Sequence, residues 1–170
     1  MNVDKNKKAL FLMDIENELE PILQEMTHIR SENVLAIQNY DTDILHPYGD
    51  IMRSVILAIY RESVEEVFVI GTKEKRTFTV NIPTQLESMK DKTQTLDYLF
   101  QNCMPEFSGG TVNEWLNGKG NSSDNIEKSV EIIRHHPLVP SHVKVQGLIV
   151  DKRDEKSLIV EVPETKTNLG

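Results

Sequence analysis

The chain has 170 residues, of which 38% are hydrophobic, and a formal net charge of −8. This length is enough for one well-buried core and too short for two independent domains, so a single domain is expected over residues 1–163, followed by a flexible tail over residues 164–170. Because an acidic chain without a long Lys/Arg run lacks the clustered cations that bind phosphates, no nucleic-acid partner is expected.

Short apolar segments along the chain predict four buried strands, over residues 8–14, 34–39, 64–71 and 143–151. In the first of them the apolar run ends at Asp14, which leaves it far too short for a signal-peptide core or a membrane span. Hydrophobic residues at helical spacing predict helices between the strands, over residues 17–30, 50–63, 84–102, 112–116 and 123–136.

Alternating strands and helices are typical of α/β proteins. The sequence therefore predicts an α/β fold with a mainly parallel central sheet of four strands and helices on both faces. Residues 157–162 follow a short turn and are expected to form an antiparallel strand at the edge of this sheet.

Polar side chains follow the carboxyl ends of the first three predicted strands. They are Asp14, Glu16, Asn39, Asp41, Thr72, Lys73, Glu74, Lys75 and Arg76. Since ligands of open parallel sheets bind outside the carboxyl ends of the strands, we expect a pocket there that holds both carboxylates and ammonium groups.

Two long stretches resemble the β-class carbonic anhydrases. The run IQNYDTDILHPYGDIMRSVILAIYRESVEEVFVIG is similar to the central block of that family, with its Asn loop, Pro-aromatic-Gly turn, Arg-Ser helix start and strand ending in Gly. The run NIEKSVEIIRHHPLVPSHVKVQGLIVD is similar to the last helix, the Pro-Leu-x-Pro link and the final strand of the family. The resemblance implies a β-carbonic-anhydrase-like fold and a homodimer.

The zinc motifs of that family are altered in this chain. The family binds zinc through Cys-x-Asp-x-Arg on the first strand and His-x-x-Cys after the third, and these motifs fall on residues 12–16 and 72–75. Leu12, Thr72 and Lys75 stand at the three former zinc-ligand positions, whereas Asp14 is kept and Glu16 replaces the arginine. From the altered motifs that the resemblance identifies, we expect no zinc cofactor and no other metal in this chain. We also expect none of the family's catalytic residues.

A catalytic zinc needs about three protein donors and an open position whose water it acidifies. Without a bound zinc ion, the carbonate dehydratase reaction of the family is not expected. The leading hypothesis is therefore a catalytically inactive homologue with a binding or regulatory role in bicarbonate and carbon dioxide handling. Bicarbonate or another small anion and an inorganic-carbon uptake system are its candidate partners, and the cytoplasm is its expected location.

Other uses of the vacated site stay open. An anion pocket is one alternative, formed by Asp14, Glu16, Asn39, Thr72, Lys75 and Arg76. A second is a metal-free enzyme in which Asp14 or Glu16 is the base and Lys75 stabilises charge. A third is a site without a ligand, in which the Lys75 loop is solvated or pairs with Asp14.

A metal site elsewhere in the chain is disfavoured. Cys103 is the only cysteine and is expected to be half-buried in an apolar setting, and its isolation favours a reducing compartment. His135 and His136 are adjacent on a predicted helix and so point roughly 100° apart, which prevents joint chelation. His46 precedes Pro47, which favours a structural turn.

Overall fold

The computed structural model describes residues 7–14, 25, 27–39, 44, 46–72, 87–103, 110–117, 122–151 and 156–160. The chain divides into two compact units, residues 1–74 with 122–170 and residues 75–121. Each unit is described by itself.

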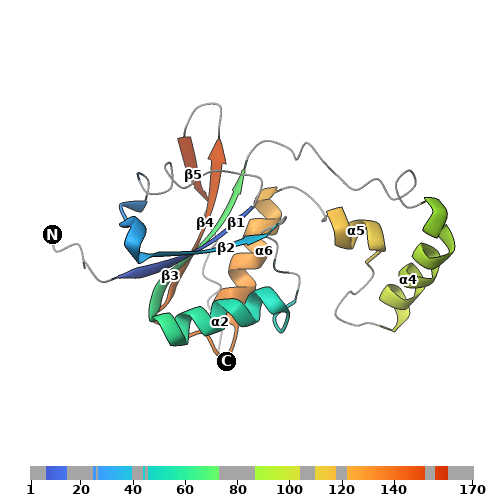
Figure 1. Ribbon diagram of the computed structural model, residues 1–170, viewed down its shortest axis with the longest axis horizontal. Coiled ribbons are helices and arrows are strands. Elements are labelled where there is room, and N and C mark those ends of the chain that lie inside the picture. The colour runs from blue at the N-terminus through green and yellow to red at the C-terminus, as the bar shows by residue number, and fades with distance from the viewer. Residues whose placement is uncertain are drawn as a thin grey trace, which may run out of the picture. The chain divides into compact units, whose positions relative to one another are not determined.

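The first unit is built on a five-stranded sheet with the order β2-β1-β3-β4-β5 (Figure 1). Its strands are β1 (Lys8–Asp14), β2 (Val34–Asn39), β3 (Val64–Thr72), β4 (Lys144–Asp151) and β5 (Lys156–Val160). The first four run parallel, and β5 pairs antiparallel with β4. The α/β fold and the four parallel strands are thereby confirmed, with strand ends within one residue of the prediction.

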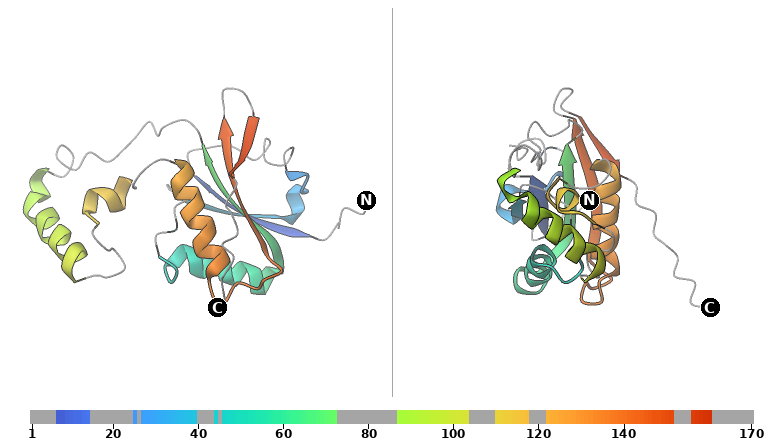
Figure 2. Two further views of the ribbon diagram at one scale, coloured as in Figure 1. Left: turned by 180° about the vertical axis from the view of Figure 1, so that it is seen from behind. Right: turned by 90° about the vertical axis from the view of Figure 1, so that its right-hand side faces the viewer.

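Two helices, α2 (Asp50–Glu62) and α6 (Ser122–His135), pack on the same face of the sheet (Figure 2). They share a face because the connections from β2 to β3 and from β3 to β4 cross the sheet in the same direction, and such crossovers are right-handed. Helices on both faces were predicted, and the described part shows these two on one face only. The helix expected over residues 17–30 lies mostly outside the described residues.

Strand β1 is an inner strand of the sheet and is buried on both faces. Its residues 9–13 are all at most 2% exposed, which explains their unbroken apolar run, since an inner parallel strand has no solvent face. Leu10 and Leu12 belong to the cluster under α2 and α6, and Phe11 belongs to the cluster on the other face. There the rings of Phe11 and Phe68 meet edge to face at 5.4 Å.

A buried hydrogen bond fixes the segment after β2 to helix α6. The Ile44 backbone N–H donates to the Ser129 Oγ at 2.9 Å, and both residues are buried. Ser129→Ala is expected to lower the free energy of unfolding by about 1 kcal/mol, because the N–H of Ile44 would lose its partner in the core. Urea denaturation measures this, with the exposed Ser54→Ala on α2 as the control expected to change little; equal effects of the two variants would contradict it.

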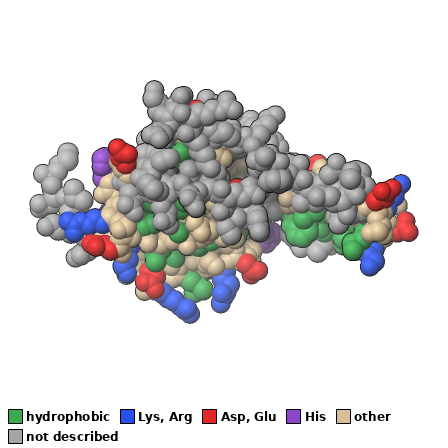
Figure 3. Space-filling view, turned by 45° about the horizontal axis from the view of Figure 1, so that its top comes forward, with side chains coloured by type: hydrophobic (Ala, Val, Ile, Leu, Met, Phe, Trp, Pro, Cys, Tyr) green, Lys and Arg blue, Asp and Glu red, His purple; other side chains and the backbone are tan. Residues whose placement is uncertain are grey.

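The second unit contains the short 3₁₀ helix η2 (Glu87–Met89) and the helices α4 (Lys90–Asn102) and α5 (Val112–Asn117). The rings of Phe100 and Trp115 meet edge to face at 5.9 Å, and the Val112 N–H donates to the Asp97 carboxylate at 2.7 Å. These contacts join α4 to α5. Large apolar side chains remain at the surface of this unit, as the right-hand part of Figure 3 shows; they are Met89, Leu96, Tyr98, Leu99 and Trp115.

Cys103 follows α4 and is exposed, so the expectation that it is half-buried was wrong. Among the described residues of its unit, Phe100 and Val112 alone are buried, so there is little core for a side chain to pack against. Within the described ranges, the helices are all too short or too polar to cross a bilayer.

Candidate functional site

The topology of the sheet favours a site at the carboxyl ends of β1 and β3. The chain leaves β1 toward β2 on one side and leaves β3 toward β4 on the other, and such a reversal of strand order is where α/β sheets bind ligands. Asp14 ends β1 directly beside Asn39, the last residue of β2. The structure thus brings together two of the residues predicted for the pocket, one carboxylate and one amide.

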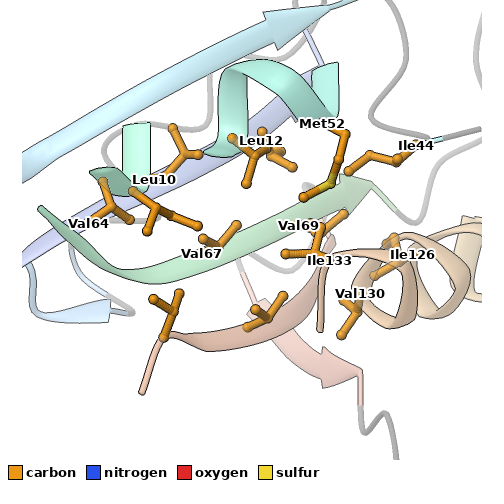
Figure 4. Packing of buried hydrophobic residues seen from close by; sticks show 14 residues of the cluster. Leu10, Leu12, Ile44, Met52, Val64, Val67, Val69, Ile126, Val130 and Ile133 are labelled. Carbon is orange, nitrogen blue, oxygen red and sulfur yellow. The ribbon is translucent and has the colours of Figure 1, made fainter. Parts of the chain in front are cut away.

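Leu12 lies one step inside the sheet from Asp14 and is part of the core. It is 2% exposed and belongs to the same apolar cluster as Met52 of α2 and Val69 of β3 (Figure 4). Its neighbours in register are Ile37 on β2 and Val69 on β3, both apolar. This side chain therefore fills space between the sheet and α2 and offers no lone pair to a ligand.

Thr72 is the last residue of β3 and lies on the other face of the sheet. Side chains alternate along a strand, so Thr72 continues the row of Phe68 and Ile70, which belong to the cluster opposite that of Leu12. Its partner in register, Val150 of β4, belongs to that cluster as well. The described strands thus do not bring Leu12 and Thr72 to one face.

Gly71 marks the closest approach between β3 and α6. A Cβ added at this glycine would lie 2.6 Å from the Ile126 Cδ1, well inside van der Waals contact. Any side chain here would push against a core residue that is 1% exposed. The glycine thus allows α6 to lie close to the end of β3, immediately before Thr72.

The other predicted site residues, Glu16, Lys75 and Arg76, lie outside the described residues, as do Asp41, Lys73 and Glu74. The pairing of Lys75 with Asp14 and the complete anion pocket therefore stay predictions. Among the residues that the structure does describe, no three His, Cys, Asp or Glu side chains are grouped so that they could hold a metal ion.

The structural turn predicted at His46 is confirmed. The Tyr48 N–H donates to the His46 Nδ1 at 3.0 Å, and the Gly49 N–H donates to the His46 carbonyl at 3.2 Å. His136 lies in the turn that follows α6 and is buried. The ring of Tyr48, from a segment far away in sequence, lies 5.1 Å from its imidazole.

Comparison with known proteins gives one strong sequence match. The chain is 68% identical over 167 residues to the carbonic anhydrase-like protein YbcF of Bacillus subtilis (strain 168), a match that spans 98% of this chain and 94% of the relative. No protein-family model matches the chain.

Solved structures share the fold at low sequence identity. The β-carbonic anhydrase isoform I of Trichomonas vaginalis matches 91% of this chain and 82% of its own, with a TM-score of 0.62 and 17% identity. An apo form of a carbon disulfide hydrolase matches 92% of this chain and 79% of its own, with a TM-score of 0.63 and 14% identity. One fold thus carries two differently named activities, so the fold by itself does not decide the reaction.

Proposed function

This chain belongs to the β-class carbonic anhydrase family, and from that premise we propose that it is a member without a zinc centre. In this proposal the protein does not hydrate carbon dioxide and has a binding or regulatory role in bicarbonate and carbon dioxide handling. The observation that supports the proposal is the packing of Leu12 in the core, since the resemblance assigns the family's first zinc ligand to this position.

The residues present at this position do not fit a zinc ion. Zinc in proteins is held by thiolate, imidazole or carboxylate donors, and a catalytic site uses about three of them. Leu12 has no donor atom, and its neighbours Met52 and Val69 make the surroundings apolar. A dication beside these side chains would lose its hydration without compensation, which is strongly unfavourable.

The proposed binding role rests on what remains at the strand ends. Asp14 and Asn39 stand side by side where ligands of parallel sheets bind, so this edge of the sheet carries a carboxylate and an amide even without a metal. Bicarbonate, which can both donate and accept hydrogen bonds, is the proposed ligand, and a homodimer beside an inorganic-carbon uptake system is the proposed assembly. In the cell, the cytoplasm is its proposed location.

The test is metal analysis joined to an activity assay. Protein purified without an affinity tag is expected to contain far less than one zinc per chain and to hydrate carbon dioxide no faster than buffer, because water without a metal remains a poor nucleophile at neutral pH. A zinc-containing member of the family, purified and assayed in the same way, is the positive control. Stoichiometric zinc or clear hydration above buffer would overturn the proposal.

A further inference from the structure

Two His-Pro turns in the first unit contain the same hydrogen bond. In the first, the Tyr48 N–H donates to the His46 Nδ1 at 3.0 Å, and in the second, the Leu138 N–H donates to the His136 Nδ1 at 3.1 Å. A neutral imidazole that accepts at Nδ1 carries its proton on Nε2. Both turns therefore hold their histidine as a hydrogen-bond donor at Nε2.

Parts of both turns line one surface cleft. Its volume is about 510 Å³, within the range of about 300–1,000 Å³ that is usual for small-molecule sites. The lining residues are Pro47, Tyr48, Lys128, Glu131, Ile132, His135, His136 and Pro137. None of them belongs to the strand-end site, so this cleft is a separate feature of the fold.

His136 supplies an unused donor in the wall of the cleft. The residue is 4% exposed, and its Nε2 is buried and makes no hydrogen bond within the described part of the chain. A buried donor without an acceptor is unfavourable, and buried polar groups in proteins are nearly always paired. An acceptor that reached this nitrogen would therefore gain a hydrogen bond that the protein alone does not make.

Tyr48 packs against the ring that carries this donor. Its ring meets the imidazole of His136 at 5.1 Å in an edge arrangement, yet the residue is 71% exposed. Turning the tyrosine side chain aside would cost little buried area, and it would remove its contact with the His136 ring. The tyrosine ring also offers an aromatic surface to a bound molecule.

The charges around the cleft favour an uncharged ligand. Lys128 and Glu131 both line it, and their charges are opposite. The carboxyl end of α6, at His135, carries the negative end of the helix dipole, which disfavours a bound anion. With Ile132 and the two prolines in the lining, the body of the ligand should be apolar.

We propose that this cleft binds an uncharged, mainly apolar molecule with a carbonyl oxygen, which accepts a hydrogen bond from the Nε2 of His136. The site goes beyond the proposed function and does not depend on whether zinc is bound elsewhere. Its test therefore uses no metal and no carbon dioxide, and the two proposals succeed or fail separately.

The probes are acetophenone, toluene and benzoate. Their binding to the full chain is monitored by the shifts of backbone amide signals in NMR titrations. Acetophenone is expected to bind about tenfold more tightly than toluene, which has the same ring and no acceptor, since one hydrogen bond is worth about this much. Benzoate is expected to bind more weakly than acetophenone because of its charge. The amides that shift are expected to be those of Tyr48, Leu138 and the end of α6.

A matched pair of variants isolates the donor. In His136→Asn, the side-chain oxygen can still accept the Leu138 N–H, but the Nε2 donor is gone, so acetophenone should bind no better than toluene. His46→Asn makes the same change in the other turn, where the histidine does not line the cleft, and should leave the tenfold difference intact.

Three results would overturn the proposal. The first is equal affinity of the wild-type protein for acetophenone and toluene, and the second is shifts at other amides. The third is a second copy of the chain that already covers the cleft, seen as concentration-dependent shifts of these amides without any probe.

Discussion

Leu12→Ala is expected to lower the free energy of unfolding by about 2–5 kcal/mol, the cost of removing a leucine side chain from a packed core. Leu12 is 2% exposed, and the strands on both sides of it are apolar at the same level. The cavity left between β1 and α2 would therefore be filled neither by solvent nor by a polar group of the described residues. Urea denaturation followed by circular dichroism measures the change.

Two further substitutions at this position separate packing from metal binding. Leu12→Met keeps the volume and should cost less than about 1.5 kcal/mol. Leu12→Cys introduces a thiol where the resemblance puts the first cysteine of the family motif, yet it should destabilise the protein and bring no zinc, because the described side chains of the surrounding cluster are apolar. An alanine variant as stable as the wild type would show that Leu12 is not packed in the core. A cysteine variant with stoichiometric zinc would show that the position can still hold a metal ligand.

Gly71→Ala is expected to lower the free energy of unfolding by about 1–3 kcal/mol through overpacking. The new methyl group would lie 2.6 Å from the Ile126 Cδ1, and Ile126 is itself 1% exposed, so neither group can move away freely. Either α6 shifts away from β3 or the isoleucine leaves its preferred rotamer. Denaturation midpoints of the purified variant measure the loss.

The Ile126→Val background provides the control for this prediction. Valine lacks the Cδ1 atom, so the clash with the new methyl group should largely disappear, and Gly71→Ala should cost clearly less there than in the wild-type background. If the cost of Gly71→Ala is the same in both backgrounds, the glycine is needed for a reason other than contact with α6.

The strands were the most predictable part of the fold. Residues 9–13 form an unbroken apolar run, and β1 is indeed covered on both faces, which is why its ends could be placed to the residue. Helices α2 and α6 were predictable because their apolar positions recur at helical spacing. The face that each helix covers could not be read from that spacing, since it depends on the direction in which the chain crosses the sheet.

The candidate site was only partly predictable. The strand-end rule correctly placed Asp14 beside Asn39, because parallel strands end at the same edge of the sheet. The rule could not predict that Leu12 and Thr72 lie on opposite faces of the sheet. That depends on how side chains alternate between the two faces along each strand. The cleft at His136 could not be predicted from the sequence, where only a repeated His-Pro pair marks it. Its walls come from segments about ninety residues apart in the chain.

The sequence by itself pointed to the family and to the parallel sheet, since these depend on residue types and on local periodicity. Only the tertiary structure decided that Leu12 is a core residue, that Gly71 is where α6 approaches β3, and that the Nε2 of His136 makes no hydrogen bond to another described residue. The physical reason is that burial, close contact and hydrogen-bond pairing are properties of neighbours in space. Those neighbours are brought together by the crossovers of the sheet and do not adjoin in the chain.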